Sequence, residues 1–140
     1  MQHKEYDLQK QVCKYLEYQY PKVLFLSDTI ASVKLTKPQQ VRNKAIQKKG
    51  FKCPDLIIFE PNDKYIGLFI ELKIETPYKK DGKTLLKNEH IEGQRDTMLQ
   101  LMSRGYFCSF AWTFEQTKGI IDNYLNRSSQ ILPLSSHLLE

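Results

Sequence analysis

The sequence predicts an α/β fold in which a mixed β-sheet is flanked by helices. Two apolar runs, at residues 56–59 and 65–74, are separated by a turn at residues 60–63, so we expect two paired strands joined by that turn. A helical segment at residues 89–104 leads into a further apolar strand at residues 106–112. Because a helix that connects two strands is the crossover of a β-α-β unit, these strands should be parallel and their connection right-handed.

Before these strands the sequence predicts two helices and one strand. Residues 5–20 carry apolar side chains at spacings of three and four, which is the period of one helix face. The apolar residues 23–27 predict a short strand, and residues 39–48 predict a short helix.

The last predicted helix spans residues 114–125, and Thr113 and Gln116 form a capping-box pattern at its start. The strand before it is apolar throughout, which suits a strand covered on both faces. At 140 residues the chain is expected to be one domain. Its core should lie at about residues 5–125, followed by a tail at residues 126–140 that is partly extended or used in subunit contacts.

The chain is basic, with a net charge of +5, and much of the excess is concentrated in one segment. Seven cations lie between residues 34 and 52, and no acidic residue interrupts them. They are Lys34, Lys37, Arg42, Lys44, Lys48, Lys49 and Lys52. A polyanion such as DNA is the natural partner of such a segment, although a solvated loop gives the same pattern.

The cysteine, histidine and apolar content argues against several other classes of protein. The three cysteines, Cys13, Cys53 and Cys108, are far apart and show no C-x-x-C spacing, so neither a disulfide framework nor a zinc site is expected. The histidines are scattered, which gives little support to histidine-based zinc or general-base chemistry. No stretch approaches the ~20 apolar residues of a membrane span, so we expect an intracellular, cytoplasmic protein with no membrane partner.

Charged side chains in the turn-linked strands give the strongest functional signal. Asp55 opens the first strand, and in the second strand Glu71 and Lys73 alternate onto one face. If the strands pair, the Asp55 carboxylate reaches the same point as Glu71. Two carboxylates and a lysine that converge on a sheet form a hard-cation site of the kind used by nucleases.

A simpler interpretation exists for each of these residues. An aspartate before a strand is often only a turn residue, and a Glu-x-Lys pair on a strand is often a solvated ion pair. Glu71 and Lys73, however, interrupt a strand that is otherwise apolar. Charges are seldom left in such a strand without a partner or a metal, so we favour the functional interpretation.

Glu5 falls on the same face of the first predicted helix as Leu8, Val12 and Leu16, so its carboxylate is expected to point inward. The alternative is a first-turn acid that is favoured only by the helix dipole.

Gln94 lies on one stripe of its predicted helix with Met98 and Leu101, where a hydrophobic side chain would otherwise pack. A buried amide must be hydrogen-bonded, and the candidate partners are Glu71, Lys73 and a metal-bound water.

These residues resemble the pattern of the PD-(D/E)xK nuclease superfamily, and from about Glu5 to Leu125 the chain resembles its VRR-NUC (virus-type replication-repair nuclease) family. In that family an N-terminal helix carries a glutamate, and a PD pair, an ExK on the next strand and a glutamine on the following helix come after it. Here the corresponding residues are Glu5, Pro54-Asp55, Glu71-Leu72-Lys73 and Gln94. The resemblance implies a restriction-endonuclease-like core.

The resemblance also implies a role for each residue in metal-dependent hydrolysis. Asp55, Glu71 and the backbone carbonyl of Leu72 would hold Mg²⁺ or Mn²⁺, and Glu5 would complete the metal shell directly or through water. Lys73 would position the attacking water and stabilise the transition state. Gln94 would orient the other groups.

The function implied is that of a phage or prophage nuclease that acts on DNA in replication, recombination or repair. We expect structure-selective or nonspecific cutting, with branched or flap structures as candidate substrates, and we expect a homodimer. One alternative is a restriction-like or Holliday-junction-resolving endonuclease of the same superfamily. Another is an inactive module that binds nucleic acid without cleaving it.

The polar connection before the third helix carries Tyr78, Lys79 and Lys80 beside the expected site. It is predicted either to close over nucleic acid as a mobile lid, with Tyr78 stacked on a base, or to be a disordered hairpin tip.

Overall fold

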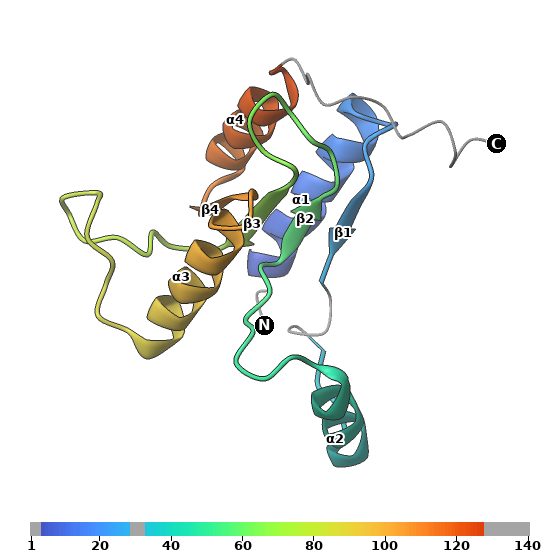
Figure 1. The fold of residues 1–140 in the computed structure, drawn as a ribbon, viewed down its shortest axis with the longest axis vertical. Coiled ribbons are helices and arrows are strands. Elements are labelled where there is room, and N and C mark those ends of the chain that lie inside the picture. Colours follow the sequence, from blue (N-terminus) through green and yellow to red (C-terminus); the bar gives the residue numbers. More distant parts are fainter. Residues whose placement is uncertain (1–3, 29–32, 128–140) are drawn as a thin grey trace.

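A computed structural model describes residues 4–28 and 33–127, which contain every predicted helix and strand (Figure 1). The elements are α1 (Lys4–Gln19), β1 (Phe25–Ser27), α2 (Lys37–Ile46), β2 (Leu56–Ile58), β3 (Leu68–Leu72), α3 (Glu89–Met102), β4 (Phe107–Ala111) and α4 (Phe114–Leu125). The strands are shorter than predicted. Most of the predicted tail, from residue 128 onward, lies outside the described residues.

The four strands form one sheet in the order β1-β2-β3-β4. β1 and β2, and β2 and β3, run antiparallel, whereas β3 and β4 run parallel with α3 between them. The predicted mixed sheet is therefore confirmed. Asp55 stands directly before β2 and Glu71 lies near the end of β3, so the two inner strands carry the acidic residues.

Both faces of the sheet are covered, and β3 lies in the middle of the layers (Figure 1). Its residues Leu68, Ile70 and Leu72 form one core with α1 and α4. Phe69, on the opposite face, forms a second core with Met98 of α3. Side chains alternate along a strand, so Glu71 projects toward α3 as Phe69 does. All five residues of β3 are buried, and an acidic side chain in this strand needs partners.

Helices α1 and α4, which lie on the same face of the sheet, are joined by a hydrogen-bonded cluster. The hydroxyls of Tyr15 and Tyr20 donate to Asp122 Oδ1 over 2.6 and 2.7 Å. Lys118 Nζ lies 3.2 Å from Asp122 Oδ2. Burial of Asp122 acts to raise the pKa of its carboxyl, but these three donors outweigh it and hold that pKa below its usual value.

The capping box predicted at the start of α4 is half correct. Thr113 Oγ1 accepts a hydrogen bond from the Gln116 backbone N–H over 3.1 Å, as expected for a helix cap. Gln116 Oε1, however, accepts from the backbone N–H of Trp112 rather than Thr113. A complete capping box forms at α2 instead, between Thr36 and Gln39.

Helix α2 buries none of its residues and projects away from the sheet (Figure 1). The three cysteines are free, as expected. Among the residues described, no helix is both long and apolar enough to cross a membrane.

Candidate active site

Asp55 is held at the start of β2 by backbone contacts on two sides. Its Oδ2 accepts a hydrogen bond from the Leu72 backbone N–H over 2.9 Å. Its carbonyl oxygen accepts from the backbone N–H of Asp28, 2.8 Å away at the end of β1. The preceding residue, Pro54, is fully buried. The carboxylate is therefore fixed beside β3, where the sequence predicted it.

Glu71 lies at the centre of the site, with only 5% of its surface exposed. Its Oε2 accepts a hydrogen bond from the Asp55 backbone N–H over 3.2 Å. Its Oε1 lies 3.9 Å from Lys73 Nζ and accepts a 2.5 Å hydrogen bond from Gln94 Nε2. The structure therefore brings together four of the five predicted catalytic residues, and the predicted contact between Gln94 and Glu71 is present.

The electrostatics of this centre favour an added positive charge. Burial raises the pKa of the Glu71 carboxyl, and the nearby Asp55 charge raises it further, against an opposing effect of Lys73. Burial also raises the pKa of Asp55, although the hydrogen bond from Leu72 opposes that shift. Two acids thus share a poorly solvated space with one lysine, so a cation or protons must complete the charge balance.

Gln94 has an incomplete set of partners. Its side chain is 6% exposed, and its Oε1 is buried with no hydrogen-bond partner within the described residues. A buried amide oxygen left in this way is suited to accept from a water molecule in the site.

His90 is a site residue that the sequence analysis missed. Its Nε2 lies 3.2 Å from Gln94 Nε2, one helical turn away on α3. Partial burial lowers the pKa of His90, and the charges of Lys73 and Lys52 lower it further. A neutral ring can accept the hydrogen bond from Gln94. The four-residue spacing from Gln94 was the signal in the sequence.

Glu5 is exposed, so it is not the buried, inward-pointing carboxylate that the sequence predicted. The reason is its place in the first turn of α1, whereas the buried residues of this helix, Val12 and Leu16, come about two turns or more later. Its charge nevertheless raises the pKa of both Asp55 and Glu71. Glu5 therefore lies at the rim of the site, close enough to act on it electrostatically.

Asp28 is a second acid that the sequence analysis missed, because it belongs to no motif. Its charge contributes to the raised pKa of Asp55. A cavity of about 510 Å³ lies beside it, lined by Asp28, Asp55 and Phe51, with side chains of α2 on the far side. This volume is within the ~300–1,000 Å³ range of small-molecule sites.

The donor set suits a magnesium or manganese ion. The side chains available are carboxylates, and hard cations prefer oxygen ligands. In the part of the chain that the structure describes, no three His, Cys, Asp or Glu side chains converge as a metal-binding group. Mg²⁺ is commonly held by one or two carboxylates, waters and substrate phosphates, which is what Asp55 and Glu71 can provide.

The connection between β3 and α3 forms an ordered hairpin at its base. Tyr78 pairs with Leu85, and its ring packs edge-on against Phe110 and Trp112 with centroids 6.2 and 5.7 Å away. The half-buried ring of Tyr78 therefore packs against β4 and the residue that follows it, and the predicted stacking on a base stays a prediction. Lys79 and Lys80 beside it are exposed.

The cations predicted to bind nucleic acid are exposed from Lys34 to Lys52, and three of them, Lys37, Arg42 and Lys44, lie on α2. Lys52 extends across α3 at Gly93, where a Cβ atom would lie only 2.8 Å from Lys52 Nζ. The missing side chain at Gly93 therefore allows the Lys52 ammonium to lie next to the helical turn that carries Gln94.

The fold and the site together define a mixed-sheet α/β domain with an acidic centre between its inner strands and a crossover helix. A solved structure described as "VRR_NUC domain protein" is similar to this chain, with a TM-score of 0.61 and 18% sequence identity. The similarity covers 92% of this chain and 93% of that one. No protein-family model and no curated protein matches the sequence. The structural similarity confirms the fold that the sequence resemblance implied.

Proposed function

We propose that this protein is a metal-dependent nuclease that hydrolyses phosphodiester bonds in DNA. The observation that carries the proposal is the convergence of Asp55, Glu71, Lys73 and Gln94 around one buried point. A purely structural protein has no need for two destabilised carboxylates in its central strands. The similarity to a VRR_NUC domain protein supports the same conclusion.

The proposed site uses Asp55, Glu71 and the Leu72 carbonyl to hold Mg²⁺ or Mn²⁺, with Glu5 contributing from the rim. When bound, the ion lowers the pKa of a water and neutralises charge that builds on the scissile phosphate. Lys73 directs its ammonium to the attacking water and to that phosphate. Gln94 fixes Glu71 through Nε2 and leaves Oε1 to accept a hydrogen bond from water.

The proposed substrate is DNA, cut in a structure-selective or nonspecific way. The net charge of +5 and the exposed cations of residues 34–52 support a polyanionic substrate. Action on branched or flap structures in phage or prophage replication, recombination or repair, and a homodimeric state, follow from the VRR-NUC resemblance and belong to the same proposal.

The test is cleavage of labelled single-stranded, duplex, flap and four-way-junction DNA with Mg²⁺ or Mn²⁺. Wild type should cut in a metal-dependent way, and Lys73→Ala should not. Lys22→Ala removes an exposed lysine outside the site and serves as the matched control. If wild type binds DNA but cuts none of the substrates with either metal, the protein is instead a binding module, and cutting at one fixed sequence would indicate a restriction-like enzyme.

A further inference from the structure

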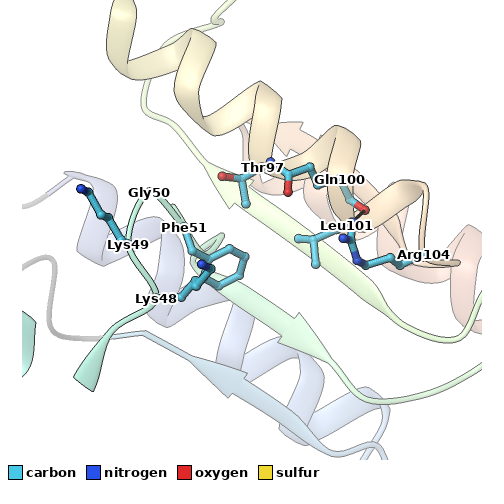
Figure 2. Close-up of a pocket in the computed structure, with 8 residues that line it drawn as sticks. All are labelled: Lys48, Lys49, Gly50, Phe51, Thr97, Gln100, Leu101 and Arg104. Carbon is cyan, nitrogen blue, oxygen red and sulfur yellow. Dashed lines mark hydrogen bonds between the residues drawn. The ribbon is translucent and has the colours of Figure 1, made fainter. Parts of the chain in front are cut away.

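A small basic cavity lies between α3 and the segment that follows α2 (Figure 2). Lys48, Lys49 and Phe51 line it from that segment, Thr97 and Gln100 line it from α3, and Arg104 lines it from the turn that follows α3. Its volume is about 180 Å³. Drug-sized ligands occupy ~300–1,000 Å³, so this cavity suits a smaller group.

The charge of the cavity selects an anion. Lys48, Lys49 and Arg104 contribute three cations, and no acidic residue lines the cavity. The ion pairs formed within residues 4–28 and 33–127 involve none of these three cations. The Arg104 guanidinium donates to the Gln100 carbonyl over 2.9 Å, which leaves most of its N–H groups for an oxyanion.

Phe51 gives the cavity an aromatic wall. The side chain is 41% exposed although it is large and apolar. It lines the basic cavity and also the larger cavity beside Asp55. An exposed ring next to unpaired cations is the combination that binds unpaired nucleotides, because the cations contact phosphates and the ring stacks on a base.

The basic cavity is connected to the candidate active site by α3. The Lys52 backbone N–H donates to Thr97 Oγ1 over 3.2 Å, and Thr97 follows Gln94 by less than one turn. At ~1.5 Å per residue, Gln100 lies about 9 Å beyond Gln94 along the helix, and Arg104 lies farther on, in the turn after the helix ends. At ~3.4 Å per nucleotide this corresponds to roughly three to four nucleotides of a DNA strand.

We propose that this cavity is a second phosphate-binding subsite of the nucleic-acid substrate, several nucleotides from the scissile bond, in which Lys48 and Arg104 hold the phosphate and Phe51 stacks on an adjacent unpaired base. The inference rests on the proposed function and assigns the path of the substrate strand along α3.

The test measures binding of labelled single-stranded DNA in EDTA, where no metal-dependent cleavage occurs. Lys48→Gln combined with Arg104→Gln should reduce the slope of log affinity against log salt by about 0.7, because one phosphate is no longer neutralised. Phe51→Leu should weaken binding by roughly fivefold or more without changing that slope. The control variant combines Lys14→Gln and Lys22→Gln, which removes the same charge from exposed residues in and after α1, across the sheet from α3. Its slope of log affinity against log salt should be steeper than that of the cavity variant.

The outcomes separate this proposal from the proposed function. If wild type cleaves DNA but the cavity variants bind like the charge-matched control, the subsite is wrong and the nuclease stands. If the cavity variants lose binding but wild type cuts nothing with either metal, the nuclease is wrong, and the cavity is a nucleic-acid-binding site without a scissile bond. If the double variant fails to fold, Lys48→Gln alone tests the subsite, since it leaves the Arg104 hydrogen bonds intact.

Discussion

Asp55 and Glu71 hold each other in place through reciprocal hydrogen bonds to the backbone. The Asp55 carboxylate accepts from the N–H of Leu72, next to Glu71, and the Glu71 carboxylate accepts from the N–H of Asp55 itself. The carboxylates that are proposed to hold the metal therefore also join the start of β2 to the end of β3 by hydrogen bonds. A substitution at either residue therefore changes both stability and metal binding, unless the new side chain still accepts the backbone hydrogen bond.

Asp55→Asn should separate the two roles. Its side-chain oxygen can still accept from the Leu72 N–H, so the free energy of unfolding should stay close to that of wild type. Cleavage should fall on the order of a hundredfold or more, because a metal-binding charge is lost. Urea unfolding and cleavage rates measure the two effects.

Asp55→Ala is the comparison variant, because it leaves the Leu72 N–H without its acceptor. It should cost about 1–3 kcal/mol in unfolding free energy. If Asp55→Asn cleaved DNA at the wild-type rate, the proposed role of Asp55 in metal binding would be contradicted.

The stability of the metal-free protein should fall as the pH rises from about 5 to about 9. The pKa of Glu71 is raised by burial and by Asp55, so the folded state holds its proton more tightly than the unfolded state. The stabilisation that protonated Glu71 gives the folded state is fully present below the pKa of the unfolded chain, ~4.3. It is lost as the pH rises through the higher pKa that Glu71 has in the folded state.

Mg²⁺ binds the ionised carboxylates, so it should raise the melting temperature more at high pH than at low pH. Thermal unfolding in EDTA and in Mg²⁺ tests this, and Glu71→Gln should remove most of the difference. If Mg²⁺ raised the melting temperature equally at low and at high pH, the assignment of Asp55 and Glu71 as the metal-binding carboxylates would be contradicted.

Gly93→Ala should stabilise α3 or leave it unchanged while it weakens DNA binding. Alanine is favoured over glycine in a helix interior by about 0.5–1 kcal/mol. The added Cβ would displace the Lys52 ammonium, which lies 2.8 Å away at the end of a flexible side chain. Thermal unfolding and DNA affinity measure the two effects.

Gly119→Ala is the matched control for Gly93→Ala, because a Cβ there meets nothing within 4 Å. It should gain similar stability with no loss of DNA binding. Equal binding by both variants would show that the position of Lys52 is unimportant.

Tyr15→Phe should destabilise the fold by about 1–3 kcal/mol, since it removes a hydrogen bond to the charged Asp122 between α1 and α4. Tyr18→Phe removes a hydroxyl from a side chain that is 86% exposed and should have little effect. Chemical denaturation of both variants at neutral pH measures the difference. Similar stability of the two would mean that the cluster around Asp122 contributes little.

The fold was largely predictable because strand and helix periods are local properties of the sequence. The face shared by Glu71 and Lys73 followed from alternation along a strand, and the burial of Gln94 followed from its helical stripe. The exposure of Glu5 was not predicted, because periodicity gives the face of the helix on which a side chain lies but not how far neighbouring elements cover it.

The residues that were missed join the site only through tertiary structure. Asp28 reaches Asp55 by the pairing of β1 with β2, and Arg104 lines the same cavity as Lys48 only when α3 packs next to the segment after α2. Likewise, the ring of Tyr78 is occupied by Phe110 and Trp112, which lie more than thirty residues further along the chain. Such relationships depend on which elements become neighbours, and a local pattern does not contain that information.

Helix α2 buries none of its residues, whereas β3 buries all five of its own. Backbone amides of α2 should therefore exchange with deuterium through local opening, while those of β3 should exchange only when the whole domain unfolds. If they do, the cations on α2 belong to a cooperative unit separate from the one that contains Asp55 and Glu71. Affinity for a polyanion could then be changed by substitutions on α2 without changing the free energy that holds together the strands that position Asp55 and Glu71.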